Sequence, residues 1–237
     1  MESERYYFDK QPFDIIKLLD SKRNLALEYI QISKVDAIFK MLHLQSGSKV
    51  LDVGCGTGYA SLRYDGFHNQ GIEVISIDIS KIEVKMAKRY AEESSKQQEF
   101  LVGNALSLPF KNESFDAAFC NNLLHHLDDH LSVIKEMGRV ARNVCCVEPN
   151  NLNPMQRRYQ KTEGAKRAGD TKAFLLGKLK SDFRRAGLEN IRTRRIHCLY
   201  PRVSGNLLKF MISVEPTLCR IPVINLISGS LVVCGEK

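Results

Sequence analysis

Three glycines within five residues follow directly on a short apolar run in the stretch VLDVGCGTGYAS, residues 50–61. The apolar run is typical of a buried strand, expected at 49–53. Gly54, Gly56 and Gly58 predict a tight loop whose backbone a ligand approaches without meeting a Cβ atom. A loop after the first parallel strand lies at the carboxyl edge of the sheet, where open α/β folds bind their ligands.

Beyond this loop, apolar runs of strand length alternate with segments of helical periodicity. This alternation is typical of a parallel sheet covered by helices. The sequence therefore predicts an α/β fold: a Rossmann-like, doubly wound, mostly parallel seven-stranded sheet with helices on both faces and helical cover at both ends of the chain. Further strands are expected at 74–78, 99–102, 116–121, 144–148, 191–197 and 230–235, and helical segments over much of 11–45.

Local signals predict where several elements begin and end. Ser80 and Glu83 have the spacing of a capping box, so a helix is expected to begin there and Asp78 to be the last residue of its strand. Gly187 predicts the end of a helix over 172–186. The polar segment 149–171, rich in Asn, Arg and Gly, is expected to be an insertion or a mobile loop.

The carboxylate of Asp52 separates two classes of cofactor that bind at glycine loops. Dinucleotide folds use the pattern G-x-G-x-x-G to place a pyrophosphate on a helix N-terminus. Here the third glycine comes one residue early, and Asp52 would repel a pyrophosphate, which disfavours a NAD-dependent oxidoreductase. A carboxylate suits a cationic ligand such as S-adenosylmethionine, which carries an ammonium group and a sulfonium and no phosphate.

The stretch VLDVGCGTG resembles the first motif of class I S-adenosylmethionine-dependent methyltransferases. Asp78, twenty residues after Gly58, is similar to the family's acid at the end of strand two. The resemblance is good over roughly 45–150 and weaker over 172–197 and 230–234, and it is greatest to the quinone-biosynthesis subgroup and the small-molecule methyltransferases around it. The other matching segments are GNALSLPF at 103–110, SFDAAFCNNLLHHL at 114–127, EMGRVAR at 136–142 and FRRAGL at 183–188.

This resemblance implies S-adenosyl-L-methionine as the methyl donor, S-adenosyl-L-homocysteine as the product, and no metal. Asp78 is expected to bind both ribose hydroxyls. Asn104 stands where the family has Asp, so an amide oxygen would accept from the adenine amino group without charge assistance. The expected donor-binding residues are Asp52, Gly54, Cys55, Gly56, Gly58, Asp78, Ile79, Asn104, Ala105 and Asn121.

Methyl transfer is an in-line displacement that needs alignment and desolvation more than side-chain chemistry. His125 and His126 are the candidate catalytic residues, because either can act as a general base at the transfer pocket. The alternative is that the pair fills the start of a helix beside the cofactor. By the same resemblance, acceptor contacts are expected from 5–30, 122–126 and 148–160.

The acceptor is expected to be a small molecule, methylated on O, C or N. The net charge is +8, and thirteen Lys or Arg stand against four Asp or Glu between 157 and 195, a balance that also suits phosphate in nucleic acid or lipid. The fourth strand ends in NNLL, without the proline motif found in methyltransferases of base amino groups. An RNA methyltransferase using 157–195 and a non-catalytic S-adenosylmethionine-binding protein are the alternatives.

One domain is expected over 1–237, with a helical lid at 1–45, a donor-binding core at 46–150, and an acceptor-side insertion, last strands and helical cover at 151–237. The apolar stretch around 205–229 is expected to pack on 11–45. It either serves ordinary core packing or also borders an apolar acceptor pocket, with the basic segment meeting a lipid phosphate in peripheral contact. No run is apolar enough to span a bilayer. Seven cysteines without a CxxC pair predict a reduced, cytoplasmic chain.

Overall fold

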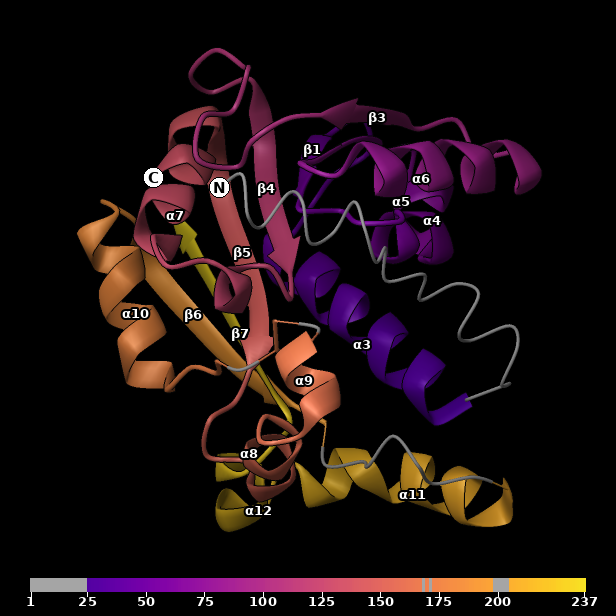
Figure 1. Ribbon diagram of the computed structural model, residues 1–237, viewed down its shortest axis with the longest axis vertical. Helices are drawn as coiled ribbons and strands as arrows, with labels where there is room; N and C mark the ends of the chain where they lie inside the picture. Colours follow the sequence, from indigo (N-terminus) through magenta and orange to yellow (C-terminus); the bar gives the residue numbers. More distant parts are fainter. Residues whose placement is uncertain (1–24, 168, 171, 198–204) are drawn as a thin grey trace.

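A seven-stranded sheet forms the centre of the computed structural model (Figure 1), which describes residues 25–167, 169–170, 172–197 and 205–237. The strand order is β3-β2-β1-β4-β5-β7-β6. β7 is antiparallel to both neighbours, and the other pairings in the described chain are parallel. The predicted fold class is therefore confirmed. The strands are β1 Lys49–Val53, β2 Glu73–Asp78, β3 Glu99–Val102, β4 Phe115–Asn121, β5 Ala141–Pro149, β6 Glu189–Ile196 and β7 Ser230–Glu236.

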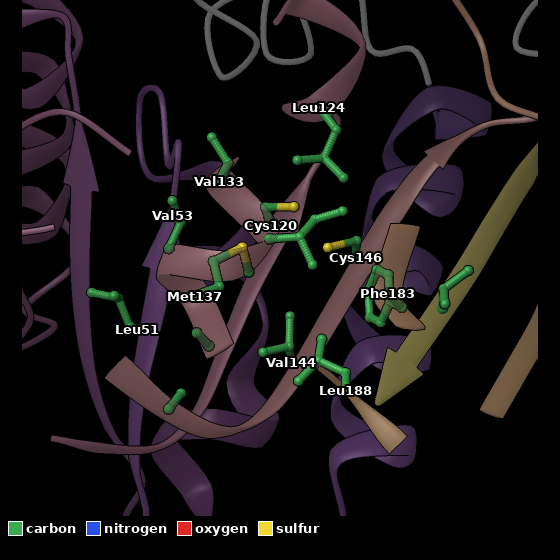
Figure 2. Packing of buried hydrophobic residues seen from close by; sticks show 14 of the residues in the cluster. Leu51, Val53, Cys120, Leu124, Val133, Met137, Val144, Cys146, Phe183 and Leu188 are labelled. Atoms are coloured by element: carbon green, nitrogen blue, oxygen red, sulfur yellow. The ribbon is translucent and has the colours of Figure 1, made fainter. Parts of the chain in front are cut away.

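Helices cover both faces of the sheet because alternate strand residues point to opposite sides. In β4, Ala118 and Cys120 face the side covered by α7 and α10, whereas Phe119 faces α3 on the other side. Figure 2 shows the first of these clusters, in which Met137 of α7 and Phe183 of α10 pack over the strands. The helices of this part are α3 Leu25–Leu42, α4 Tyr59–Arg63, α5 Asp65–Asn69, α6 Lys81–Glu93, α7 His130–Val140 and α10 Leu176–Arg185, with a 3-10 turn, η1, at Leu124–His126.

The predicted helix ends are confirmed where a local signal marks them. The Ser80 hydroxyl accepts from the Glu83 backbone N–H at the start of α6. Gly187 follows α10 with φ of +81°, a left-handed conformation that glycine adopts without strain. The lid was expected at 1–45: residues 25–42 of it form α3, whereas the helical signal before residue 25 lies outside the described residues.

Of the two alternatives expected for 149–171, an insertion or a mobile loop, the loop is wrong, because the segment contains α8 (Pro154–Tyr159) and α9 (Glu163–Arg167). Asn153 caps α8 by accepting from the Gln156 backbone N–H at 2.9 Å, and Pro154 occupies the first turn. Asn followed by Pro is a helix-start signal that the composition of the segment concealed. Both helices lie near the carboxyl ends of the parallel strands (Figure 1).

The apolar stretch near the C-terminus forms α11 (Gly205–Leu218) and α12 (Pro222–Leu226). As expected, α11 packs on the N-terminal helical segment: Leu208 lies against Ala26 of α3, and the Tyr29 hydroxyl donates to Glu215 at 2.7 Å. Figure 1 places α11 beyond the carboxyl ends of the strands, so it extends that edge instead of covering a sheet face. Among the described helices, none combines the length and apolar character that crossing a membrane requires.

One disulfide corrects the expectation of a fully reduced chain. Cys145 of β5 lies opposite Cys234 of β7 in the antiparallel register, and the two sulfurs are bonded. The two residues are 89 positions apart, so only the strand pairing brings them together. Cys55, Cys120 and Cys146 are buried thiols, as expected for cysteines inside apolar runs.

Candidate functional site

The glycine loop has a backbone that only glycine adopts readily at all three positions. Gly54, Gly56 and Gly58 have φ of +70°, +53° and +76°. A Cβ on Gly54 would lie 2.6 Å from Cδ1 of Leu123, and one on Gly58 would lie 2.8 Å from the ring of Phe100. The loop is therefore packed between the turn after β4 and the core under β3, with no room for side chains.

The carboxylate of Asp78 ties this loop to the end of β2. Its Oδ2 accepts from the Gly56 backbone N–H at 2.8 Å, and its Oδ1 accepts from that of Ser80 at 2.9 Å. The N–H groups of Gly54 and Cys55 both donate to the carbonyl of Ile77, at 2.8 and 3.2 Å. Because each carboxylate oxygen has two lone pairs, these bonds are compatible with ligand hydroxyls at the same group.

Asp52 is a buried carboxylate at the end of β1, with a relative exposure of 1%. Its Oδ2 has no hydrogen-bond partner within the part of the chain that the structure describes. Burial, and secondarily the charge of Asp78, raise the pKa of Asp52 from 3.8 to about 7, although the hydroxyls of Ser61 and Ser76 oppose the shift. A cation bound here would satisfy the orphan oxygen and favour ionisation.

We expect Asp52→Asn to raise the free energy of unfolding of the ligand-free protein at pH 8, by an amount on the order of a few kcal/mol. In the unfolded chain this carboxyl ionises near pH 4, but in the fold it ionises near pH 7. Its ionisation therefore opposes folding increasingly from pH 4 to 7 and fully above that. Urea unfolding at pH 5 and pH 8 measures the effect, which should be larger at pH 8.

Asp65→Asn is the matched control, because this exposed carboxylate pairs with Lys96 at 2.8 Å. It should cost under about 1 kcal/mol at pH 8. A stability loss in Asp52→Asn at pH 8 would show that the buried carboxylate is satisfied by the fold itself.

The other predicted donor residues lie at the ends of the neighbouring strands. Ile79 follows β2, and Asn104 and Ala105 follow β3, where the Asn104 side-chain oxygen accepts from the Leu106 N–H at 3.0 Å. Asn121 is the last residue of β4, and its Oδ1 is buried with no hydrogen-bond partner among described residues. Since β3, β2, β1 and β4 are adjacent in the sheet, the fold brings all ten predicted donor residues to one edge.

His125 is held between two carboxylates. Its Nδ1 lies 2.7 Å from Glu148 Oε2, and its Nε2 lies 3.1 Å from Asp170 Oδ1. Burial alone would lower the pKa of His125, but the charges and hydrogen bonds of Glu148 and Asp170 raise it to about 9. The ring is therefore an imidazolium at neutral pH with both N–H groups engaged, and it does not fit the predicted role of general base.

His126 has the opposite electrostatic environment. Burial and the positive charge of His125 lower its pKa to about 4, so this ring is neutral at pH 7. Its side chain is 17% exposed, with Nε2 at 3.7 Å from Asp170. Of the two predicted catalytic histidines, only His126 therefore stays a candidate for taking a proton.

Glu148 is the central residue that the sequence did not reveal. Its buried carboxylate accepts from the backbone N–H groups of Leu123, Leu124 and His125, at 3.0, 2.7 and 3.3 Å. It therefore fixes η1 and the turn that packs on the glycine loop. The only signal in the sequence was an acid ending a buried apolar strand.

Asp170 joins the 149–171 segment to the same cluster through its contact with His125. Within the segment, Tyr159 Oη donates to Asp170 at 2.9 Å. The ligand atoms of His125, His126 and Asp170 lie within 4.8 Å of one another, a spacing that metal sites also show. Both ring nitrogens of His125 are hydrogen-bonded to carboxylates, however, so the cluster is an ion-pair network in which this ring offers no lone pair.

A cavity of about 360 Å³ opens near the same edge but is lined by none of the predicted donor or catalytic residues. It lies between the turn before α7 and the start of α10. Its lining residues include Leu127, His130, Asn151, Phe174 and Lys178. The His130 ring lies against Phe174, with its Nε2 3.1 Å from Asp182.

Comparisons with known proteins agree with this geometry. Residues 51–144 match the family model described as a methyltransferase domain. The chain is 31% identical to an O-methyltransferase of Aspergillus nomiae over 125 residues, 52% of this chain and 55% of that protein. It is 34% identical to the demethylmenaquinone methyltransferase of Oceanobacillus iheyensis over 113 residues, 46% of this chain and 48% of that one. The chain spans about half the length of these curated relatives.

Solved structures share the fold over nearly the whole chain. A methyltransferase from Thermotoga maritima superposes with a TM-score of 0.69 and 17% identity, covering 99% of both chains. Phosphoethanolamine N-methyltransferase 2 of Haemonchus contortus, solved with S-adenosyl-L-methionine, gives 0.65 and 16%, covering 99% of this chain and 60% of that one. The fold is thus that of the Rossmann-like methyltransferases. Within this fold, residues 51–144 match the methyltransferase domain, which is the part that resembles class I S-adenosylmethionine-dependent methyltransferases.

Proposed function

We propose that the protein binds S-adenosyl-L-methionine at the carboxyl ends of β1 to β4 and transfers its methyl group to a small, partly apolar acceptor. The observation that carries the proposal is the buried carboxylate of Asp52, one residue before the end of β1 and beside the glycine loop, with one oxygen unpartnered among the described residues. The ammonium group of the donor would supply the missing charge and hydrogen bond.

The remaining donor contacts follow from the order of the strands. The backbone of Gly54, Cys55, Gly56 and Gly58 would pass along the methionine part, and Asp78 would accept from the ribose hydroxyls. Beside them, Ile79 would border the adenosine, and Asn104 and Ala105 would lie against the adenine. Asn121 would close the site from β4. The bound donor supplies a methyl group on a sulfonium, and these residues hold it in line with the acceptor.

The acceptor side would be built from α3, the turn after β4 and the segment after β5. This division corresponds to a donor-binding core at 46–150 and an acceptor side at 151–237, with 1–45 as the lid. The relatives named for demethylmenaquinone and for O-methylation support a hydroxylated, partly apolar acceptor. His126, neutral at pH 7, is the residue proposed to take a proton from such a hydroxyl.

In a thermal-shift assay, S-adenosyl-L-methionine and S-adenosyl-L-homocysteine should stabilise the protein and NAD should not. A ligand at a hundredfold its dissociation constant should add about 2.7 kcal/mol of stability. The pyrophosphate of NAD would face the carboxylates of Asp52 and Asp78, which explains the expected difference. Stabilisation by NAD alone would contradict the proposed donor.

An acceptor screen with radiolabelled donor then tests the transfer, using quinols, phenols, lipid-like alcohols and tRNA in separate reactions. The basic segment 157–195 keeps RNA as the second candidate. Methylation of tRNA, with binding that collapses between low and moderate salt, would favour RNA over a small molecule. Donor binding without transfer to any acceptor would favour a non-catalytic binding protein.

A further inference from the structure

Two polar residues that donor binding does not use, Lys34 and Asn122, are hydrogen-bonded beyond the turn after β4, and a third, His197, lies at the same edge of the sheet, where the charge of Lys34 acts on it. Lys34 comes from the middle of α3, Asn122 directly follows β4, and His197 directly follows β6. Lys34 and His197 are 7% and 4% exposed. β6 runs parallel to β4 because β7 is antiparallel to both β5 and β6, so Asn122 and His197 lie at the same edge of the sheet.

The backbone at this place is strained at both strand ends. Asn122 has φ of +59° and His197 has φ of +70°, in the left-handed region that non-glycine residues seldom adopt. Hydrogen bonds hold each of them there: the Asn122 N–H donates to the Val147 carbonyl at 2.8 Å, and the His197 carbonyl accepts from the Gly229 N–H at 2.6 Å. Such conformations persist where the surrounding fold enforces them, and they gather at ligand sites.

Within the described chain, the His197 ring lacks the partners that burial normally demands, and the Lys34 ammonium is paired with the neutral Asn122. Neither ring nitrogen of His197 has a hydrogen-bond partner among the described residues. The Lys34 ammonium donates to Asn122 Oδ1 at 3.3 Å, whereas the two carboxylates whose charges act on it, Glu148 and Asp170, are hydrogen-bonded to His125. A buried donor or acceptor without a partner opposes folding, so a ligand that supplies partners would bind favourably.

The charges of these groups define what such a ligand would be. Burial lowers the pKa of Lys34 to about 8, against the opposing charges of Glu148 and Asp170, so it is mainly an ammonium at pH 7. Burial, then the positive charges of Lys34 and Arg194, lower the pKa of His197 to about 3, so this ring is neutral. The site therefore offers one buried cation and one neutral ring that can donate or accept.

This place adjoins the proposed donor site. Asn122 precedes Leu123, whose side chain fills the space beside Gly54, with Cδ1 2.6 Å from where a Cβ on that glycine would be. A molecule held by Lys34 would thus lie across one turn of chain from the glycine loop.

We propose that Lys34, Asn122 and His197 form an acceptor subsite that binds an ionisable hydroxyl, a phenol or enol, as its anion. An acidic hydroxyl of this kind releases its proton to solvent on binding, so His126 serves as the base only for hydroxyls that bind un-ionised. The oxygen anion accepts hydrogen bonds from the Lys34 ammonium and the His197 ring. An anionic oxygen also enriches an aromatic ring in electrons, which favours attack on a methyl sulfonium. The inference rests on the proposed function in taking the bound molecule as the methyl acceptor.

The test uses 4-nitrophenol and its methyl ether, 4-nitroanisole, with S-adenosyl-L-homocysteine present. The phenol changes absorbance on ionisation, and the ether cannot ionise. The wild-type protein should bind the phenol at least about tenfold more tightly than the ether. The bound phenol should show the anion's absorbance below the pH at which the free probe ionises.

Lys34→Met should remove this preference and the absorbance change. It should fold at least as stably as the wild type, because burial of the ammonium opposes folding. Lys40→Met is the matched control on the same helix, with a side chain that is 62% exposed, and it should change neither readout. His197→Asn, which tolerates the left-handed backbone, should weaken phenol binding several-fold without altering binding of the ether.

Equal binding of phenol and ether by the wild type, or an unchanged preference in Lys34→Met, would overturn the subsite. Calorimetry with S-adenosyl-L-homocysteine alone separates this outcome from failure of the proposed function. If S-adenosyl-L-homocysteine does not bind, the proposed donor site is wrong. Titration of 4-nitrophenol and 4-nitroanisole in the absence of that ligand then still tests whether Lys34 binds the phenol anion.

Discussion

Asp78→Ala is expected to lower the affinity for S-adenosyl-L-methionine at least a hundredfold. The carboxylate would make two charge-assisted hydrogen bonds to the ribose, worth about 1.5–3 kcal/mol each, and each 1.4 kcal/mol corresponds to about tenfold in affinity. The same group accepts from the Gly56 and Ser80 N–H groups, so its loss also releases the glycine loop from the end of β2.

Calorimetric titration of Asp78→Ala beside Asn104→Ala tests the assignment. Asn104 would make one neutral hydrogen bond to the adenine, worth about 1 kcal/mol, so its removal should weaken binding by under about tenfold. Asp78→Asn, which keeps one acceptor oxygen, should fall between the two. Equal losses in both alanine variants would mean that the ribose is not at Asp78.

Glu148→Gln is expected to cost about 3–5 kcal/mol of stability and to abolish methyl transfer. The side chain is fully buried and accepts from three backbone N–H groups and from the His125 ring. Whichever oxygen is replaced, an amide NH₂ would face buried N–H donors. The buried charge of His125 would also lose a carboxylate partner, and the turn that packs on Gly54 would loosen.

Urea unfolding measures this loss, with Glu93→Gln as the control. Glu93 pairs with Arg89 on the exposed side of α6 at 2.7 Å, a contact worth under about 1 kcal/mol. The pH dependence adds a second readout. The raised pKa of His125 contributes stability fully below about pH 6.5, and this is lost as the pH rises towards 9. The gap between wild type and Glu148→Gln should therefore narrow from pH 7 to pH 9.

The strands were predictable because a parallel strand buried on both faces has to be apolar along its length. The expected range 49–53 agrees with the central strand β1 to the residue, and 99–102 agrees with β3, an edge strand that is only partly buried. The start of α6 at Ser80 and the end of α10 at Gly187 were also predictable, because each depends on residues within one helical turn. The common location of the expected donor-binding residues followed from the predicted strands, because the loops after adjacent parallel strands lie at one edge of the sheet.

The acceptor side could not be predicted in the same way, because its interactions join residues far apart in the chain. Glu148 meets the turn 23 positions before it, and Asp170 lies 45 positions from His125. The opposite protonation of two neighbouring histidines depends on these partners and on burial, neither of which a sequence motif contains. The proposed subsite of Lys34 and His197 likewise could not be predicted, because it joins residues from α3 and from the end of β6, which are far apart in the sequence.

The bond between Cys145 and Cys234 turns most of the proposed acceptor side into a covalent ring of chain. The ring begins one residue after the matched methyltransferase domain ends at 144, and it contains Glu148, Asp170, His197 and all helices from α8 to α12. The two ends of this stretch of chain meet where β5 pairs with β7. Segments of the ring proposed to contact the acceptor are thus able to diverge or to be exchanged as a unit, while β5 and β7 stay bonded and the strands of the proposed donor site are left undisturbed.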